Sequence, residues 1–511
     1  MSNPRGKVFL VGAGPGDPGL LTLRGRDLLA IADVVLYDYL ANPRLLQHAS
    51  DDAELLCLGR HGQAQGKGRL IAQEEVHRLM ISAAQAGKKV VRLKGGDPCV
   101  FGRLGEEVTA LEQAEVDYEI VPGVTAALAA SSYSGVPLTH RDHASCVAFI
   151  TGRECSDKSG GKLDMAGLAQ FPGTLVFYMG VTTAPDWAAE LITHGKPEST
   201  PVAIIRHASL PTQTTAVTTL GEVPTVLAPG KLRPPAIIVV GDSVAAKSNI
   251  QWFTSRPLFG RRILVTRPEH QAAELIESLE ELGATVLLQP AIAIREVEDF
   301  TPLDDAISRL DEFHWLVFSS ANGVHAFFKR LLSTEWDRQA LARTRIAVIG
   351  PATAEALAEY HLKSDIQPKE YRAEALAEEL VNDAGGTAGK RYLLLRASRG
   401  REVLATTLLA SRAKVEQVVV YRSEDVEVPD PEVATALEQG EIDWITVTSS
   451  AIARSLVAMF GHSLKKTKLA AISPLTAGVL SEAGYEAEII AEDYTSEGLV
   501  EAILKSGSPK R

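Results

Sequence analysis

Two glycine-rich turns near the N-terminus have the composition of loops that hold a ligand against the main chain. One spans residues 12–19 (Gly-Ala-Gly-Pro-Gly-Asp-Pro-Gly) and the other spans 93–102 (Leu-Lys-Gly-Gly-Asp-Pro-Cys-Val-Phe-Gly), each after an apolar run. The first differs from the dinucleotide fingerprint, because Asp17 replaces its last glycine and Pro15 lacks an N–H donor. Two such turns could instead grip one flat ligand, since glycine lets the main chain come close.

Two more turns follow apolar segments in the same region. Residues 121–127 (Val-Pro-Gly-Val-Thr-Ala-Ala) deliver a threonine to the start of a helix, and Tyr178-Met179-Gly180 ends an apolar run. A single glycine turn is often only a tight structural turn. The joint spacing of the four turns is much more specific than any one of them, and it predicts one ligand site.

The second half carries hydroxylated turns and has no nucleophile elbow, metal triad or phosphate loop. Serine or threonine follows an apolar run in five places, where a helix start presents N–H groups and a partial positive charge, which bind anions. For each turn alone, an ordinary helix cap is the alternative. The five turns are Thr266-Arg267-Pro268, Ser319-Ser320-Ala321-Asn322-Gly323, Pro351-Ala352-Thr353, Thr448-Ser449-Ser450 and Pro474-Leu475-Thr476. Gathered at one cleft, they would suit a ligand fringed with carboxylates.

Alternating strands and helices must position these turns. Short apolar runs such as 8–11 alternate with helical stretches such as 69–86, which is typical of α/β architecture. The pattern breaks at 251–260, where aromatic and polar residues mix, and a new strand follows. We therefore expect a linker there, between a first domain over 1–250 and a second over 261–511.

The second half also repeats itself. The segments 350–354 and 371–376 recur 123 positions later, and 317–321 (Val-Phe-Ser-Ser-Ala) recurs as 447–451 (Val-Thr-Ser-Ser-Ala). An internal repeat of this kind predicts two related units of structure. We expect two α/β lobes of five short strands each.

Composition argues against several classes of function. The 52 basic and 64 acidic residues give a net charge of −12, which disfavours a broad nucleic-acid footprint but allows a local basic pocket. The cysteines show no C-x-x-C spacing, so we expect neither disulfides nor a zinc site. No segment approaches the ~20 apolar residues that span a bilayer, and no signal peptide is evident, so we expect a cytoplasmic protein. The four cysteines are Cys57, Cys99, Cys146 and Cys155.

The four turns of the first half together resemble the tetrapyrrole methylases, and within them the uroporphyrinogen III C-methyltransferases, over Lys7 to about Ser248. The resemblance implies two lobes, at about 1–142 and 143–250, and a homodimer formed through this half. It also implies a site for S-adenosylmethionine made by Pro15, Gly95, Gly96, Asp97, Val100, Thr125, Ala126, Met179 and Ala208.

The chemistry that this resemblance implies asks little of the protein. An electron-rich pyrrole carbon attacks the sulfonium methyl in line, so positioning, exclusion of water and a base for one proton suffice. Asp38 matches the family's suspected base, with a helix cap or a ribose-binding group as the alternative. Arg60 replaces the family's proton-donating lysine and favours carboxylate binding, because a guanidinium does not readily give up a proton. The other candidate substrate clamps, with surface solvation as the alternative, are Arg24, Arg103 and Arg141.

The second half is similar to uroporphyrinogen III synthase from Arg261 to about Leu504. The segments that carry the similarity are Val265-Thr266-Arg267-Pro268, Leu395-Arg396 and Val419-Val420-Tyr421. The resemblance implies two flavodoxin-like α/β lobes, the first made by about 261–296 and 424–511 and the second by about 297–423.

The implied reaction is the cyclisation of hydroxymethylbilane with loss of water and inversion of the last ring, without a cofactor. The hydroxymethyl group ionises easily, so folding the bilane into the right spiral should matter more than acid–base chemistry. Tyr421 resembles a tyrosine suspected of helping the hydroxyl leave, with packing between the lobes as the alternative. The candidate substrate-binding residues are Thr266, Arg267, Ser319, Ser320, Asn322, Thr353, Arg396, Thr448, Ser449, Ser450 and Thr476.

The two resemblances meet at one metabolite, so the sequence predicts a bifunctional enzyme that makes precorrin-2. The first half could instead methylate another corrinoid; acidity and the synthase half count against diphthine or ribosomal RNA as its substrate. The second half could be a non-catalytic tetrapyrrole sensor. A dehydrogenase built on 12–38 is the weakest alternative, and no segment resembles the precorrin-2 dehydrogenase and ferrochelatase module.

Overall fold

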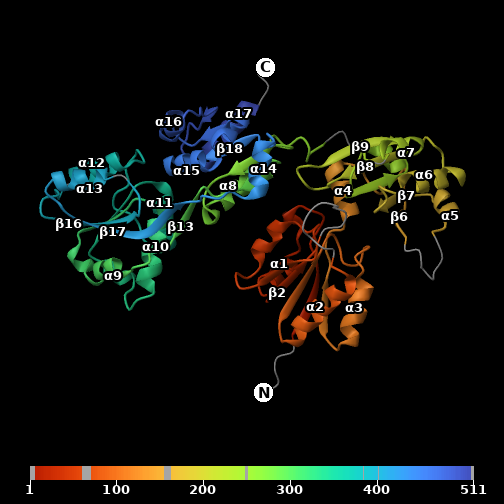
Figure 1. Cartoon of the computed structure of the whole chain (residues 1–511), viewed down its shortest axis with the longest axis horizontal. Coiled ribbons are helices and arrows are strands. Elements are labelled where there is room, and N and C mark those ends of the chain that lie inside the picture. Colours follow the sequence, from red (N-terminus) through yellow and green to blue (C-terminus); the bar gives the residue numbers. More distant parts are fainter. Residues whose placement is uncertain are drawn as a thin grey trace. The chain divides into compact units, whose positions relative to one another are not determined.

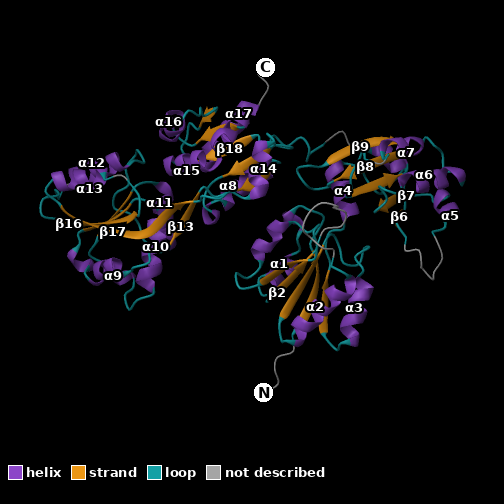
Figure 2. Cartoon of the chain, viewed as in Figure 1, coloured by secondary structure: helices purple, strands orange, loops and turns teal. Residues whose placement is uncertain are grey.

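The computed structural model describes residues 6–59, 71–154, 163–228, 230–247, 251–383, 385–400 and 402–507. The chain forms two compact units: unit 1 is Met1–Arg261 with Leu282–Thr285, and unit 2 is Arg262–Glu281 with Val286–Arg511 (Figure 1). Among the described residues each unit contains two five-stranded sheets flanked by helices (Figure 2). The α/β class expected from the sequence is confirmed. No helix in the described ranges is long and apolar enough to cross a bilayer.

The first sheet of unit 1 is parallel and covered on both faces. Its strands are β1 (Lys7–Gly12), β2 (Val34–Tyr37), β3 (Glu54–Cys57), β4 (Lys89–Lys94) and β5 (Asp117–Val121), and its helices are η1 (Pro18–Leu20), α1 (Leu23–Leu29), η2 (Pro43–His48), α2 (Gln73–Gln85) and α3 (Leu104–Gln113). The strand order is β3-β2-β4-β1-β5. Val8 and Leu10 pack against α2 and α3, whereas Phe9 and Val11 pack against α1. Burial on both faces explains the continuously apolar run.

The second sheet of unit 1 is mixed, in the order β6-β7-β10-β8-β9. Its strands are β6 (Val147–Thr151), β7 (Thr174–Tyr178), β8 (Pro201–Arg206), β9 (Thr214–Thr219) and β10 (Ala236–Val240), and its helices are α4 (Ala126–Ser134), α5 (Met165–Ala169), α6 (Ala184–Thr193), η3 (Leu220–Glu222), α7 (Val223–Val226) and η4 (Asp242–Ala246). Ala127 and Ala130 of α4 pack on one face, beside Val176 and Val239. Helices α5 to α7 cover the other face. Because α4 follows β5 directly, it joins the two sheets.

The segment expected as a linker, 251–260, packs on unit 1. Phe253 is only 2% exposed, and its ring centroid lies 4.7 Å from that of Tyr133 on α4. The indole N–H of Trp252 donates to the main-chain oxygen of Ser132 at 2.9 Å. We call this contact of Trp252 and Phe253 with α4 the aromatic clasp. It makes the segment part of the fold of unit 1.

Unit 2 consists of two lobes. Lobe A contains β11 (Arg262–Val265), η5 (Glu269–Gln271), α8 (Ala273–Glu281), β12 (Thr285–Leu288), α14 (Pro431–Glu438), β18 (Trp444–Val447), α15 (Ser450–Phe460), η8 (Gly461–Lys466), β19 (Lys468–Ala471), α16 (Pro474–Glu482), β20 (Ile489–Ile490) and α17 (Ser496–Gly507). Its strand order is β12-β11-β18-β19-β20, so the first two strands in the chain are exchanged in the sheet. This is the flavodoxin-like order expected from the sequence.

Lobe B is formed by the middle of the unit. It contains β13 (Ile292–Arg295), α9 (Thr301–Ser308), η6 (Leu310–Glu312), β14 (Trp315–Phe318), α10 (Ala321–Leu332), η7 (Arg338–Leu341), β15 (Arg345–Val348), α11 (Pro351–Glu359), α12 (Ala373–Asn382), β16 (Arg391–Ala397), α13 (Val403–Ala410) and β17 (Lys414–Asp425). Its strand order is β13-β17-β16-β14-β15. Each lobe therefore has five strands, as the repeat predicted.

The two lobes follow one plan. In the sheet of lobe B, β17, β16, β14 and β15 stand in the order in which β12, β11, β18 and β19 stand in lobe A. An isolated bridge between Ala347 and Ile366 repeats the pairing of Ala470 with Ile489, and both partners are shifted by 123 positions. The internal repeat predicted from the sequence is confirmed.

Two details differ from the prediction. The match of 317–321 with 447–451 is wrong by one residue, because Ser320 and Ser449 both cap helices and are therefore the true counterparts. The sheet of lobe B also begins at β13, before the expected boundary near 296. Strand β17 extends beyond the end of β16, so the main chain of residues 422–425 needs other hydrogen-bonding partners. Strand β13 supplies them in antiparallel register.

Replacing Phe253 by alanine tests the aromatic clasp. We expect the free energy of unfolding of unit 1 to fall by about 3–5 kcal/mol, the range for truncating a buried phenylalanine. Hydrogen exchange read by mass spectrometry measures this, because peptides of the two units are followed separately. The control Leu23→Ala, at a side chain that is 71% exposed, should change stability by less than ~0.5 kcal/mol. Equal losses in the two variants would contradict the clasp.

Candidate functional site

Three glycine turns meet at the carboxyl end of the first sheet. They follow the adjacent strands β4, β1 and β5. Gly14 N donates to Gly96 O at 3.1 Å and Gly96 N donates to Gly14 O at 2.8 Å. A Cβ on Gly12 would lie 2.6 Å from the Cα of Gly123, and a Cβ on Gly123 would lie 2.3 Å from Gly96 O. Glycine is required here because main chain packs directly on main chain.

The carboxylate of Asp97 ties the second turn to the third. Its Oδ1 accepts from Cys99 N at 2.7 Å and its Oδ2 accepts from Gly123 N at 2.9 Å. Both oxygens therefore already accept hydrogen bonds within the protein, although a carboxylate oxygen can accept more than one.

A second wall comes from α4 and from the ends of β7 and β8. The hydroxyls of Thr125 and Tyr178 lie 2.7 Å apart, and Ala127 N donates to the Tyr178 hydroxyl at 3.1 Å. Burial is the main reason why the pKa of Tyr178 is raised. Val100 and Ala126 pack against the cluster that contains Tyr178 and Ala208. Residues from four segments of unit 1 therefore converge.

The first turn closes onto this wall. Asp17 N donates to the Ser209 hydroxyl at 3.1 Å, and the Tyr133 hydroxyl donates to Asp17 Oδ2 at 2.7 Å. Pro15 is partly buried in this turn. Met179, next to Tyr178, is 52% exposed and has a φ of 53°. The nine residues assigned to the cofactor from the sequence thus all lie on these turns and strand ends.

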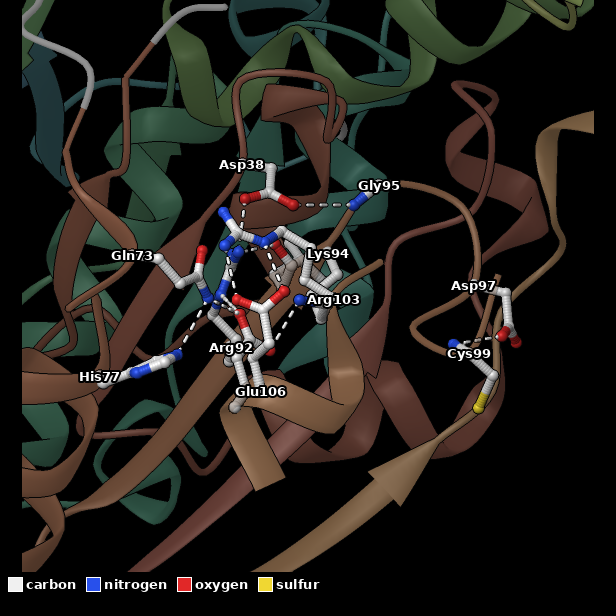
Figure 3. A network of polar contacts seen from close by, with 12 residues as sticks. Asp38, Gln73, His77, Arg92, Lys94, Gly95, Asp97, Cys99, Arg103 and Glu106 are labelled. Carbon is white, nitrogen blue, oxygen red and sulfur yellow. Dashed lines mark hydrogen bonds and ion pairs between the residues drawn. The ribbon is translucent and has the colours of Figure 1, made fainter. Parts of the chain in front are cut away.

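Asp38 caps a network of buried charges (Figure 3). Arg92 Nη2 lies 2.6 Å from Asp38 Oδ1, and Gly95 N donates to Asp38 Oδ2 at 3.4 Å. Deeper in, Glu107 Oε1 lies 3.2 Å from Arg92 Nε and Glu107 Oε2 lies 2.6 Å from Lys94 Nζ. Burial and the nearby Arg92 charge lower the pKa of the Lys94 ammonium, while Glu107 opposes that shift.

The arginines predicted to bind substrate carboxylates differ in their surroundings. Arg24 is paired with Glu119 at 2.9 Å, and Arg103 is paired with Glu106 at 2.5 Å. Arg141 is exposed, in the turn closed by the bridge between His140 and Ala144. Arg60 lies outside the described residues. A substrate carboxylate would therefore compete with Glu119 or Glu106 for Arg24 or Arg103.

In unit 2 two of the predicted hydroxyls cap helices. Ser320 Oγ accepts from Gly323 N at 3.1 Å, and Ser449 Oγ accepts from Ile452 N at 3.2 Å. Ser473 does the same for Thr476 N at 3.3 Å. Ordinary capping, the alternative weighed for these turns, is thus the observed role of these side chains. Ser319 is exposed, and Thr448 and Ser450 are half-buried.

Three of the predicted threonines are buried. Thr266 is fully buried and donates to Thr446 O at 2.6 Å. Thr353 is 4% exposed and Thr476 is 2% exposed. The Thr476 hydroxyl lies 3.1 Å from Ser473 Oγ. The presence of a threonine at a strand end therefore did not distinguish a buried residue from an exposed one.

Lobes A and B meet beside Arg267. Asn322 Oδ1 accepts from Gln271 Nε2 at 2.6 Å and lies 3.1 Å from His270 Nε2. Arg267 Nη1 donates to Ser496 Oγ at 2.9 Å. Burial lowers the pKa of the Arg267 guanidinium, and the negative charge of Glu274 opposes that shift.

Tyr421 lies within β17, and Arg396 lies next to the last residue of β16. The Tyr421 hydroxyl lies 3.1 Å from Ser320 Oγ, and the residue is 8% exposed. Arg396 is paired with Glu402 and also donates to Gln417 Oε1 at 2.7 Å.

Several residues that contact the predicted site residues were not identified from the sequence. Arg92 and Lys94 are two residues apart at the end of a strand whose residues 90, 91 and 93 are apolar, which was a usable sign that two charges share one face. Glu107 was visible only as part of a polar helix start. His270 and Gln271 gave no local signal, because their partner Asn322 is distant in the sequence.

Two family models match the chain. Residues 7–224 match the tetrapyrrole (corrin/porphyrin) methylases, and residues 273–501 match uroporphyrinogen-III synthase HemD. A porphyrin biosynthesis protein HemD of Ruminiclostridium josui is 34% identical over 98% of this chain and 98% of its own length. The uroporphyrinogen-III C-methyltransferase of Bacillus subtilis (strain 168) is 39% identical over 71% of this chain and 74% of its own. A crystal structure of uroporphyrin III C-methyl transferase from Thermus thermophilus shares 43% identity, covers 47% of this chain and 99% of its own, and has a TM-score of 0.40.

These matches and the two units define a two-part enzyme, a methyltransferase joined to a synthase. The chain belongs to the tetrapyrrole methylases over its first half and to the uroporphyrinogen-III synthases over its second.

Alanine at Ser320 or at Ser449 removes an equivalent helix cap from lobe B or lobe A. We expect each change to lower the free energy of unfolding of unit 2 by about 1 kcal/mol, the usual value of an N-cap. Denaturant unfolding with hydrogen-exchange readout measures the loss in each lobe. Ser319→Ala is the matched control, because its exposed side chain is not the helix cap, and it should cost less than ~0.5 kcal/mol. A loss in the control as large as in the cap variants would argue against capping.

Proposed function

We propose that the chain makes precorrin-2 from hydroxymethylbilane. Unit 2 cyclises the bilane to uroporphyrinogen III with inversion of ring D, and unit 1 then methylates that product twice with S-adenosylmethionine. The observation that carries this proposal is the presence of both families in one chain, together with a relative that matches 98% of its length. The product of one half is the substrate of the other.

The three glycine turns of unit 1 fit S-adenosylmethionine. Gly95 and Gly96 have no side chain of their own and are half-buried, so a ligand can come close to the main chain of this turn. Phe101 and Met179 are 40% and 52% exposed beside the turns and offer apolar surface to a flat base. S-adenosylmethionine supplies the methyl group that is transferred. Pro15, Asp97, Val100, Thr125, Ala126 and Ala208 complete the proposed site.

We propose that the Asp38 carboxylate contacts the tetrapyrrole substrate of the methylase. Arg92 and Gly95 N fix its carboxylate, and each oxygen keeps a lone pair for a displaced proton or a pyrrole N–H. Arg141 is exposed and suited to a substrate carboxylate, and we propose the same role for Arg60. Arg24 and Arg103 would have to exchange their present carboxylate partners.

Unit 2 needs mainly to hold the bilane in a spiral before it closes. The turns that start α10 and α15 carry Ser319, Thr448 and Ser450 at or beside helix N-termini, where main-chain N–H groups favour carboxylates. Arg267, Arg396 and Asn322 add donors, and Tyr421 is assigned to help the hydroxyl leave. We propose that this half needs no cofactor, that the chain works as a cytoplasmic homodimer formed through unit 1, and that it binds no nucleic acid.

The decisive experiment incubates the full chain anaerobically with hydroxymethylbilane and S-adenosylmethionine. We expect doubly methylated precorrin-2, identified by mass spectrometry, and uroporphyrinogen III when S-adenosylmethionine is omitted, identified by isomer-resolving chromatography. Uroporphyrinogen III without methylation would refute the assignment of unit 1. Uroporphyrinogen I alone, the spontaneous product, would refute catalysis by unit 2 and favour a tetrapyrrole sensor.

Gly96→Ala tests the cofactor site. Gly96 has a φ of +69°, which strains an alanine by about 1–2 kcal/mol and should shift the turn. We expect the KM for S-adenosylmethionine to rise roughly tenfold while the rate at saturation is kept. The control Gly105→Ala, with open space and no positive φ, should leave both unchanged. A normal KM in Gly96→Ala would remove the second turn from the site.

A further inference from the structure

The charges behind Asp38 form a network that is almost entirely buried, and Asp38 is its most exposed charged member. The side chains of Arg92, Lys94 and Glu107 are 5%, 3% and 0% exposed, whereas that of Asp38 is 35% exposed. Two cations face two carboxylates, so the charges balance. Buried charges persist only when they are paired and hydrogen-bonded, so each of the three deep members depends on the others.

Glu107 is the centre of this network. Its Oε1 accepts from Arg92 Nε at 3.2 Å and from Gln73 Nε2 at 3.3 Å, and its Oε2 accepts from Lys94 Nζ at 2.6 Å. It belongs to α3, which starts just after the second glycine turn. Removing its charge would leave two neighbouring cations buried with one carboxylate between them.

Two arms lead from Glu107 to the proposed site. Through Arg92 it reaches Asp38, because the same guanidinium touches both carboxylates. Through Lys94 it reaches the glycine turns, because Lys94 immediately precedes Gly95 and its main-chain oxygen accepts from Ala13 N at 2.7 Å. A planar guanidinium with donors in fixed directions transmits orientation from one carboxylate to the other.

We propose that Glu107 is a positioning residue for methyl transfer. It holds Arg92 so that the Asp38 carboxylate keeps one orientation toward the substrate, and it holds Lys94 so that the second glycine turn stays against the first. This inference rests on the proposed methyl transfer at these turns. Glu107 itself touches neither substrate nor cofactor.

The first test compares Glu107→Gln with Glu112→Gln in the full chain, assayed for methylation of uroporphyrinogen III. Both changes remove one carboxylate from α3, but Glu112 is exposed, and among the described contacts its carboxylate accepts a hydrogen bond from the Tyr118 hydroxyl alone. We expect Glu107→Gln to lower kcat roughly tenfold or more, with the KM for uroporphyrinogen III changed less than ~threefold, since orientation of a reacting group is lost. Glu112→Gln should behave as the wild type. An unchanged kcat in Glu107→Gln overturns the proposal.

The second test asks whether Glu107 acts through Asp38. In a double-mutant cycle, Glu107→Gln should reduce kcat much less in an Asp38→Asn background than in the wild type, because the oriented carboxylate is already gone. A purely structural effect would reduce kcat by the same factor in both backgrounds, and that result overturns the proposal. A wild-type chain that does not methylate would instead refute the proposed function.

Arg92→Lys keeps the inference testable if Glu107→Gln does not fold. The charge count is preserved, but a single ammonium cannot present the fork that joins Asp38 to Glu107. We expect roughly the same tenfold loss of kcat, with unit 1 folded by hydrogen exchange. A folded Arg92→Lys variant with full kcat would overturn the proposal.

Discussion

Direct packing of main chain on main chain, where three glycine turns meet, is the constraint on which the rest of unit 1 depends. A Cβ on Gly123 would lie 2.3 Å from a main-chain oxygen, so no side chain can enter. Strands β4, β1 and β5 must therefore be neighbours with their carboxyl ends at one edge, as in a parallel sheet. The helices that follow these turns then pack on the faces of the sheet.

The same closeness explains why charges are buried beside the turns. The side chains of Arg92 and Lys94 lie on one face of β4, at its end just before the glycines. Helix α3 covers them there and supplies Glu107. Such a pair of cations would be very costly alone, and the carboxylates on either side offset that cost. The more exposed carboxylate, Asp38, is thereby paired with a guanidinium that is almost entirely buried.

Local pattern was enough to predict some features and not others. The α/β class, the glycine turns and the internal repeat depend on residue types at short range, and all of these are present in the structure. Which hydroxyl at a strand end faces inward depends on packing from distant segments, so Thr353 and Thr476 could not be separated from exposed neighbours. The pairing of β13 with β17 joins segments far apart in the chain and leaves no local trace.

The aromatic clasp bears on how such a two-part gene can be divided. Trp252 and Phe253 follow the last strand of unit 1 and cover apolar surface on α4, so they belong to its fold although they lie outside the segment that matches the methylase family. A rearrangement that separated the coding regions just after residue 250 would strip α4 of this cover. A break that leaves both rings with the first half would preserve it, so we expect the stability of the first half to depend on which side of the connecting segment is cut.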